Sequence, residues 1–256
     1  MSRVVGLLSW YDEAPSWLAA CVASFAPHID ALVAVDGPYA AFPHNGKAKS
    51  SPEQAEAIQR VCDAVGLELI LHQPSFPWIG GEVEKRTQAF HLCQSITDEQ
   101  DWIWVFDADE VLTSAPADFR TQMDDAPSDA VVATLIQPQD LDEPDGFAAS
   151  LGIPNENRHD LTMIFRALDG LRVVGRHDTY VAGPDEKPVY LWGPSTLPVV
   201  TPWRMVGLEV EHRTHRRAAN RKAASAEYYR TRDLLGLERL GQRVMETEDG
   251  SMEAVR

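Results

Sequence analysis

Two aspartates, Asp107 and Asp109, follow an apolar run and have the spacing needed to share a metal ion. The run, Trp102–Phe106, contains no polar residue, which is typical of a strand buried on both faces of a parallel sheet. Acids directly after such a strand lie at its carboxyl end, the edge where open α/β sheets bind ligands. Two carboxylates there can bind Mn²⁺ or Mg²⁺, which in turn binds phosphate oxygens. The stretch therefore predicts a metal-assisted site for a phosphate-bearing ligand.

The same letters satisfy a second motif. Asp107, Asp109 and Val111 match the Asp-x-Asp-x-[Thr/Val] nucleophile motif of haloacid-dehalogenase-like phosphatases. That motif belongs on the first strand of those enzymes, whereas three strands are expected before Asp107, and no convincing downstream lysine and acid pair follows. A phosphatase with Asp107 as its nucleophile is the alternative enzyme that the motif allows.

The residues before Asp107 predict the elements that hold this site. Hydrophobic residues make up 44% of the 256-residue chain, enough for one large domain with an appended tail. Apolar runs and helical spacing predict a βαβ half able to hold a nucleotide, with Asp36 at the end of its second strand. Strands are expected at 4–8, 31–35, 67–71 and 102–106, and helices at 15–25, 52–65 and from about 82.

The residues after Leu112 follow a different pattern. A further strand is expected at 131–136, then a polar surface loop, and then a hairpin formed by 161–166 and 171–174 around Asp169-Gly170. Val206, Leu208 and Val210 alternate with polar residues or glycine and predict a strand that ends at His212. The expected divisions are a nucleotide-binding half at 1–112, an acceptor-side half of the same domain at 113–235 and a C-terminal helix and tail at 236–256.

Charge and cysteine usage limit the classes of partner and compartment. The net charge of −16 argues against general nucleic-acid affinity. Residues 213–232 are locally +6, which indicates either a phosphate-facing surface or a solvated helix face. Cys21, Cys62 and Cys93 have neither zinc-site nor disulfide spacing. Because the chain also lacks a long apolar span and a signal-peptide pattern, we expect a soluble, cytoplasmic protein.

The first 112 residues resemble the nucleotide-binding half of GT-A glycosyltransferases of family 2. The resemblance lies in strand-end Asp36, in the Gly80-Gly81 turn followed by Lys85-Arg86, and in the Phe-Asp-Ala-Asp-Glu stretch at 106–110. It implies a Rossmann-like α/β fold, with a mixed, mostly parallel sheet flanked by helices and a smaller acceptor-side region. It also implies an enzyme that moves a sugar from a nucleotide-diphosphate donor, for which a UDP-sugar is favoured, to a hydroxyl acceptor.

The resemblance assigns roles to these residues. Asp36 would contact the nucleoside, and Asp107 and Asp109 would hold the ribose and Mn²⁺ or Mg²⁺ with the donor diphosphate. Arg86, with Lys85 beside it, would lie near the nucleotide. A helix N-terminus with nearby cations suits a diphosphate for physical reasons as well. A protein that binds a nucleotide sugar without catalysis is the remaining alternative.

Two later segments extend the likeness. Met163–Arg166 followed by Gly175–Asp178 is similar to an "lFR … g..HE" pattern of some bacterial members, with Asp178 in place of the usual glutamate. Inverting transfer needs a carboxylate to remove the acceptor proton, and Asp178 is the candidate base. GT-A enzymes often add a C-terminal histidine to the metal or diphosphate site; His212 is preferred here over His215 and His177. A saccharide acceptor is the family default, and the basic segment leaves room for a protein or modified nucleic acid.

Overall fold

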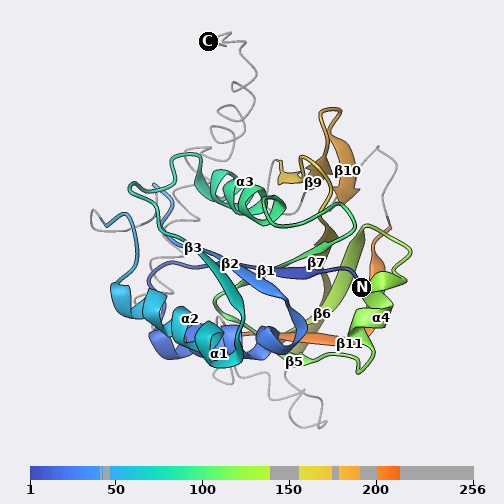
Figure 1. The fold of residues 1–256 in the computed structure, drawn as a ribbon, viewed down its shortest axis with the longest axis horizontal. Helices are drawn as coiled ribbons and strands as arrows, with labels where there is room; N and C mark the ends of the chain where they lie inside the picture. The colour runs from blue at the N-terminus through green and yellow to red at the C-terminus, as the bar shows by residue number, and fades with distance from the viewer. Residues whose placement is uncertain (41, 43–46, 139–155, 175–178, 191–200, 214–256) are drawn as a thin grey trace, which may run out of the picture.

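A curled, mixed β-sheet flanked by helices forms the centre of the folded protein in a computed structural model (Figure 1). The structure describes residues 1–40, 42, 47–138, 156–174, 179–190 and 201–213. The large sheet has eight strands in the order β3-β2-β1-β4-β7-β6-β11-β5, and a second sheet has three in the order β10-β9-β8. The predicted α/β class and mixed, mostly parallel sheet are confirmed. No helix of the described residues is long and apolar enough to cross a membrane.

The first half of the chain builds four parallel strands with helices between them. Its strands are β1 (Val4–Ser9), β2 (Ala31–Val35), β3 (Glu68–His72) and β4 (Trp102–Asp107), and its helices are α1 (Pro15–Phe25), the 3₁₀ turn η1 (Ala26–His28), α2 (Pro52–Val65) and α3 (Gly81–Gln94). In the register of these strands Ser9 lies opposite both Val35 and Asp107. The carboxyl ends of β1, β2 and β4 therefore lie level at one edge.

Alternating side chains of these strands pack into two hydrophobic layers. Val4 and Leu8 face the cluster that contains α1 and α2, whereas Val5 and Leu7 face the cluster that contains α3. Figure 1 shows α1 and α2 on one side of the sheet and α3 on the other. Because both faces are covered, the strands need apolar residues at every position, as the unbroken run before Asp107 predicted. The three cysteines are buried and free, and they lie one on each of α1, α2 and α3.

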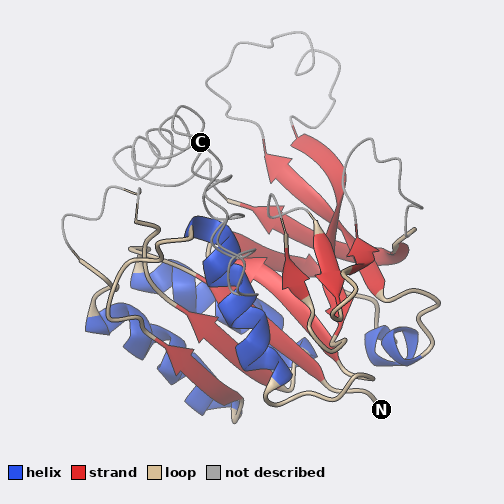
Figure 2. Ribbon diagram, turned by 90° about the horizontal axis from the view of Figure 1, so that it is seen from above, coloured by secondary structure: helices blue, strands red, loops and turns tan. Residues whose placement is uncertain are grey.

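The second half of the chain curls the sheet back toward α1. It contributes β5 (Glu110–Ser114), α4 (Phe119–Asp124), β6 (Ala130–Pro138), β7 (Glu156–Arg166), β8 (Arg172–Val173), β9 (Tyr180–Ala182), β10 (Lys187–Tyr190) and β11 (Trp203–His212). β7 joins the parallel half by pairing antiparallel with β4. β5 ends the strand order, yet Leu112 N donates to Ser24 Oγ of α1 at 3.0 Å. The sheet has therefore turned far enough to bring its last strand against the first helix (Figure 1). Figure 2 shows the same sheet from above, with its strands in red.

Three details of the second half were not predicted correctly. The expected hairpin of 161–166 with 171–174 is wrong: β7 already has β4 and β6 on its two edges, so β8 pairs with β9 in the small sheet. β5, which follows the aspartates, was missed. Strict alternation in β11 is also wrong at Val206, which is 80% exposed, because the register shifts near Gly207, whose φ is +84°.

The boundaries of the early helices follow the sequence closely. α1 begins at Pro15 and α2 at Pro52, where the missing N–H costs nothing because the first helical turn has no acceptor for it. Gly66 ends α2 in the left-handed conformation, with φ +71°.

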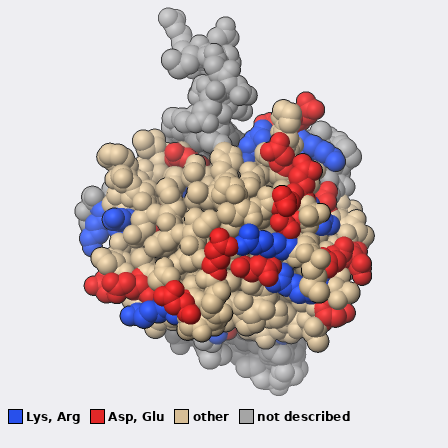
Figure 3. Space-filling view, in the orientation of Figure 1, with Lys and Arg blue, Asp and Glu red and all other residues tan. Residues whose placement is uncertain are grey.

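The predicted tail at 236–256 and all but Arg213 of the basic segment lie outside the described residues. On the face in Figure 3, basic side chains lie beside acidic ones and do not gather into one patch.

Candidate functional site

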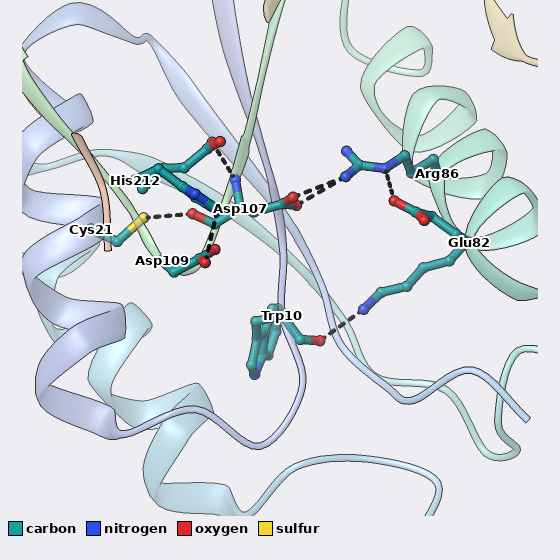
Figure 4. A network of polar contacts seen from close by, with 9 residues as sticks. Trp10, Cys21, Glu82, Arg86, Asp107, Asp109 and His212 are labelled. Atoms are coloured by element: carbon teal, nitrogen blue, oxygen red, sulfur yellow. Dashed lines mark hydrogen bonds and ion pairs between the residues drawn. The ribbon is translucent and has the colours of Figure 1, made fainter. Parts of the chain in front are cut away.

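Charged side chains from two strands, one turn and one helix meet at the carboxyl edge of the parallel strands (Figure 4). Asp107 ends β4, and Asp109 lies in the short turn between β4 and β5. Arg86 reaches the same place from α3, and His212 from the end of β11. The parallel register aligns the strand ends, and the curl of the sheet adds β11. The structure thus brings together four of the residues that the sequence selected.

Asp107 is bound by Arg86. The Nη2 atom of Arg86 lies 3.2 Å from Oδ1 and 3.0 Å from Oδ2 of Asp107, and its Nε donates to Glu82 at 3.1 Å. The Arg86 side chain is 8% exposed and that of Asp107 is 39% exposed. Burial disfavours the charged form of Arg86, but Asp107 and Glu82 more than offset burial and raise its pKa. The guanidinium is therefore a fixed positive charge between two carboxylates.

Asp109 is bound by His212 through the pairing of β5 with β11. Glu110 lies opposite His212 in that register, and Arg213 N donates to Asp109 O at 2.7 Å. This places His212 Nε2 3.0 Å from Asp109 Oδ2. Burial alone would lower the pKa of His212, but the hydrogen bond to Asp109 and the neighbouring carboxylates raise it. The carboxylate of Asp109 is 3% exposed and thus held firmly.

A third carboxylate, that of Glu110, stabilises the backbone of the turn between β4 and β5. Its Oε2 accepts from Asp107 N at 2.8 Å, and the residue is 5% exposed. Burial, followed by the negative charges of Asp107 and Asp109, raises the pKa of Glu110 above its usual range. On the α1 side, Cys21 Sγ lies 3.5 Å from Asp107 O. These contacts fix the backbone of the turn, so the two aspartate side chains project from a defined position.

Asp36 is directed into the loop that follows it. Its carboxylate is fully buried and accepts four hydrogen bonds: from Gly37 N, from N and Oγ of Ser50, and from Gln73 Nε2, at 2.6–2.9 Å. The contacts to Gly37 and Ser50 tie the two ends of the 37–50 segment together. Trp78 Nε1 also donates to Asp36 O at 2.9 Å. Asp36 therefore holds the two ends of the 37–50 segment together, and its contact with a nucleoside remains a prediction.

Lys85 fixes the backbone beneath this edge. Its Nζ donates to Trp10 O at 2.8 Å and to Gly37 O at 2.9 Å, and the residue is 2% exposed. Burial lowers the pKa of Lys85 to about 7, although the nearby charges of Asp36 and Asp107 oppose the shift. Lys85 thus links the segments after β1 and β2. Its ammonium group already uses two of its donor hydrogens for these backbone carbonyls.

The donor atoms at this edge suit a divalent cation in part. Two ligand atoms bound about 2.1 Å from one cation at a right angle lie about 3 Å apart. Asp109 Oδ2 and His212 Nε2 have that spacing, at 3.0 Å. Asp107 is directed to Arg86, and within the described residues no group of three His, Cys, Asp or Glu side chains is arranged to hold a metal ion. The same 3.0 Å is the length of the hydrogen bond between Asp109 and His212, so a metal site formed by Asp107, Asp109 and His212 stays a prediction.

Several residues that contribute to the site were missed from the sequence. Ser50 and Gln73 bind Asp36, and Glu82 binds Arg86. Tyr39 and Tyr180 also lie near Arg86. Glu82 stands four residues before Arg86, a helical spacing that could have indicated the ion pair. The others lie on loops or on the small sheet, where no periodicity connects them to the acids.

The proposed base and two alternative histidines lie outside the described residues: Asp178, His177 and His215. The flanking residues are described. Val174 N donates to Thr179 O at 2.9 Å, so these two residues lie side by side. β9 then begins at Tyr180, which stacks on Phe165 with ring centroids 4.1 Å apart. The small sheet also contacts α3, which carries Arg86.

A scan against protein-family models gives no match, and a search of curated proteins finds no significant relative.

Proposed function

We propose that the chain is a metal-dependent GT-A glycosyltransferase that moves a sugar from a nucleotide-diphosphate donor to a hydroxyl acceptor. The observation that carries the proposal is the meeting of Asp107, Asp109, His212 and Arg86 at the carboxyl ends of parallel strands. This edge is where α/β sheets bind nucleotides. The set combines candidate ligands for a metal ion with the buried, positively charged guanidinium of Arg86. A UDP-sugar is the favoured donor, and the cation is Mn²⁺ or Mg²⁺.

The residues divide the work of binding the donor. Asp36 and Lys85 fix the backbone against which the nucleoside would lie. The N-terminus of α3 would lie near the diphosphate. Asp107, Asp109 and His212 would hold the cation. When bound, that cation neutralises the charge that develops on the diphosphate leaving group. Arg86 supplies a second, permanent positive charge beside it.

The acceptor side uses the small sheet. Asp178 takes the proton of the acceptor hydroxyl as the bond to the anomeric carbon forms, which inverts the configuration at that carbon. The residue lies outside the described part, two positions before β9. A saccharide is the proposed acceptor, with a protein or modified nucleic acid as alternatives through the basic segment. A cytoplasmic setting suits the three free, buried cysteines.

A thermal-shift screen of nucleotide diphosphates and their sugars, with and without Mn²⁺, tests the proposal. A ligand at 100 times its Kd stabilises the folded state by about 2.7 kcal/mol, which is roughly 5–10 °C for a chain of this size. We expect such a shift for one nucleotide with Mn²⁺ and its loss in Asp109→Asn. Asp125→Asn is the matched control, because Asp125 is exposed and lies at the end of α4.

Two outcomes would overturn the proposal. One is the absence of any nucleotide shift in the wild type. The other is hydrolysis of p-nitrophenyl phosphate by the wild type but not by Asp107→Asn, which would favour the phosphatase. The role of Asp178 is tested separately: Asp178→Asn should keep donor binding and lose transfer, and a fully active variant would remove it as the base.

A further inference from the structure

The ion pair between Arg86 and Asp107 uses groups that the donor complex also needs. One nitrogen of Arg86 contacts both carboxylate oxygens of Asp107, at 3.2 and 3.0 Å. A cation bound to Asp107 in this arrangement would lie beside the guanidinium and be repelled by it. A diphosphate approaching Arg86 would meet Asp107 and be repelled likewise. The two ligands therefore compete with an internal partner when either binds alone.

The two halves of the site differ in how firmly they are held. Asp109 is 3% exposed and is fixed by His212 and by the backbone of Arg213. The Asp107 side chain is 39% exposed, and Arg86 is the only described residue that donates to its carboxylate. Glu82 holds Arg86 at Nε, on a different nitrogen from the one that contacts Asp107. Arg86 can thus change the partner of Nη2 while Glu82 keeps it in place.

We propose that Arg86 and Asp107 exchange partners when donor and cation bind together. Resting on the proposed function, Arg86 passes from Asp107 to the diphosphate, and Asp107 passes from Arg86 to the cation that Asp109 and His212 would also bind. Neither ligand alone satisfies both released groups, so the cation and the nucleotide bind cooperatively. By linkage, each raises the affinity for the other by the same factor.

Two reciprocal variants test the exchange by binding alone. Arg86→Gln releases Asp107, so we expect Mn²⁺ without nucleotide to bind about tenfold more tightly than to the wild type, within the usual range of coupling between sites. Asp107→Asn releases Arg86, so inorganic pyrophosphate in EDTA should bind about tenfold more tightly. Titration calorimetry measures both, and Mn²⁺ is also followed by its electron paramagnetic resonance. Arg120→Gln is the control, because it breaks an Arg–Asp pair of 2.8 Å with Asp30 elsewhere.

The outcomes are distinct from those of the proposed function. Unchanged or weaker Mn²⁺ binding in a folded Arg86→Gln variant overturns the exchange, as does unchanged pyrophosphate binding in Asp107→Asn. If Arg86→Gln does not fold, the Asp107→Asn comparison decides. The effect of UDP on Mn²⁺ binding to the wild type is measured in parallel. Lack of any UDP binding would refute the glycosyltransferase, while the metal-alone and pyrophosphate-alone comparisons would still decide whether Arg86 and Asp107 exchange.

Discussion

The buried carboxylate of Asp36 leads to a prediction that separates a loop-organising role from a nucleoside contact. Its two oxygens accept from Gly37, Ser50 and Gln73, and no part of the residue is exposed. Asp36→Asn keeps the shape of the side chain but replaces one acceptor with a donor and removes the charge. If the carboxylate organises the 37–50 segment, this variant should be less stable even when no nucleotide is present.

The expected loss of stability depends on which hydrogen bonds the asparagine side chain can still form. An amide nitrogen in place of Oδ2 would face two donors, Ser50 N and Gln73 Nε2, and leave both unpaired. In place of Oδ1 it faces Gly37 N and the Ser50 hydroxyl, and only the hydroxyl can become an acceptor. This second orientation loses one bond and weakens the rest. Since a bond to a charged acceptor contributes about 1.5–3 kcal/mol, we expect a loss of about 3 kcal/mol.

Urea unfolding followed by circular dichroism measures this loss, which corresponds to roughly 6–12 °C in Tm for a domain of this size. Tryptic cleavage under native conditions reports on the segment itself, because Lys47 and Lys49 are exposed within it. Asp125→Asn, at an exposed site, should change neither quantity. The reasoning fails if the free energy of unfolding of Asp36→Asn is within about 0.5 kcal/mol of the wild-type value, the range of ordinary surface substitutions, and only nucleotide binding is lost.

Three further predictions concern neighbouring positions. Because the pKa of Lys85 is lowered to about 7 from 10.5, the folded state binds fewer protons than the unfolded state between these values. The stability of the wild type relative to Lys85→Met should therefore rise from pH 7 to pH 10 in urea titrations, by at most about 1.4 kcal/mol per pH unit; a flat difference would refute the assignment. Gly37→Ala should lower Tm far more than Gly66→Ala, because both glycines have positive φ but only at Gly37 would a Cβ meet a proline ring atom, at 2.5 Å; equal effects would contradict the crowding. Phe25→Ala should cost about 3–5 kcal/mol in urea unfolding, because Phe25 is fully buried and stacks on Phe106 with centroids 4.0 Å apart; a loss below about 1 kcal/mol would show that the core closes around the space.

The parallel half of the fold could be predicted because its signals are local. Pro15 and Pro52 begin helices, Gly66 ends one, and unbroken apolar runs specify strands covered on both faces. The second half depends on pairings between distant segments. The apolar residues of 161–166 and 171–174 predict two strands equally well whether they pair with each other or not. Only the occupation of both edges of β7 by β4 and β6 excludes the hairpin, and sequence periodicity contains no such information.

The residues of the candidate site were likewise predictable where the signal is local and not where it depends on distant contacts. Asp107, Asp109 and Arg86 were selected from motif and helix position, and they meet. The burial of Asp36 could not be foreseen, because its partners Ser50 and Gln73 lie on loops without periodicity. A strand-end aspartate looks the same in sequence whether its carboxylate points at a ligand or at the backbone that follows it.

The contact between Asp109 and His212 depends on the curl of the sheet. These residues are about a hundred positions apart, and the strand order puts β5 and β11 at the end of the sheet that is remote from β2 and β3. Only two residues separate β4 from β5, so the chain itself ties that remote end to the end of β4. Pairing of β5 with β11 then delivers His212 to Asp109. A change that straightened the sheet would therefore separate His212 from the aspartates even if every strand still formed, which makes the Asp109–His212 contact a direct measure of whether the second half has closed over the first.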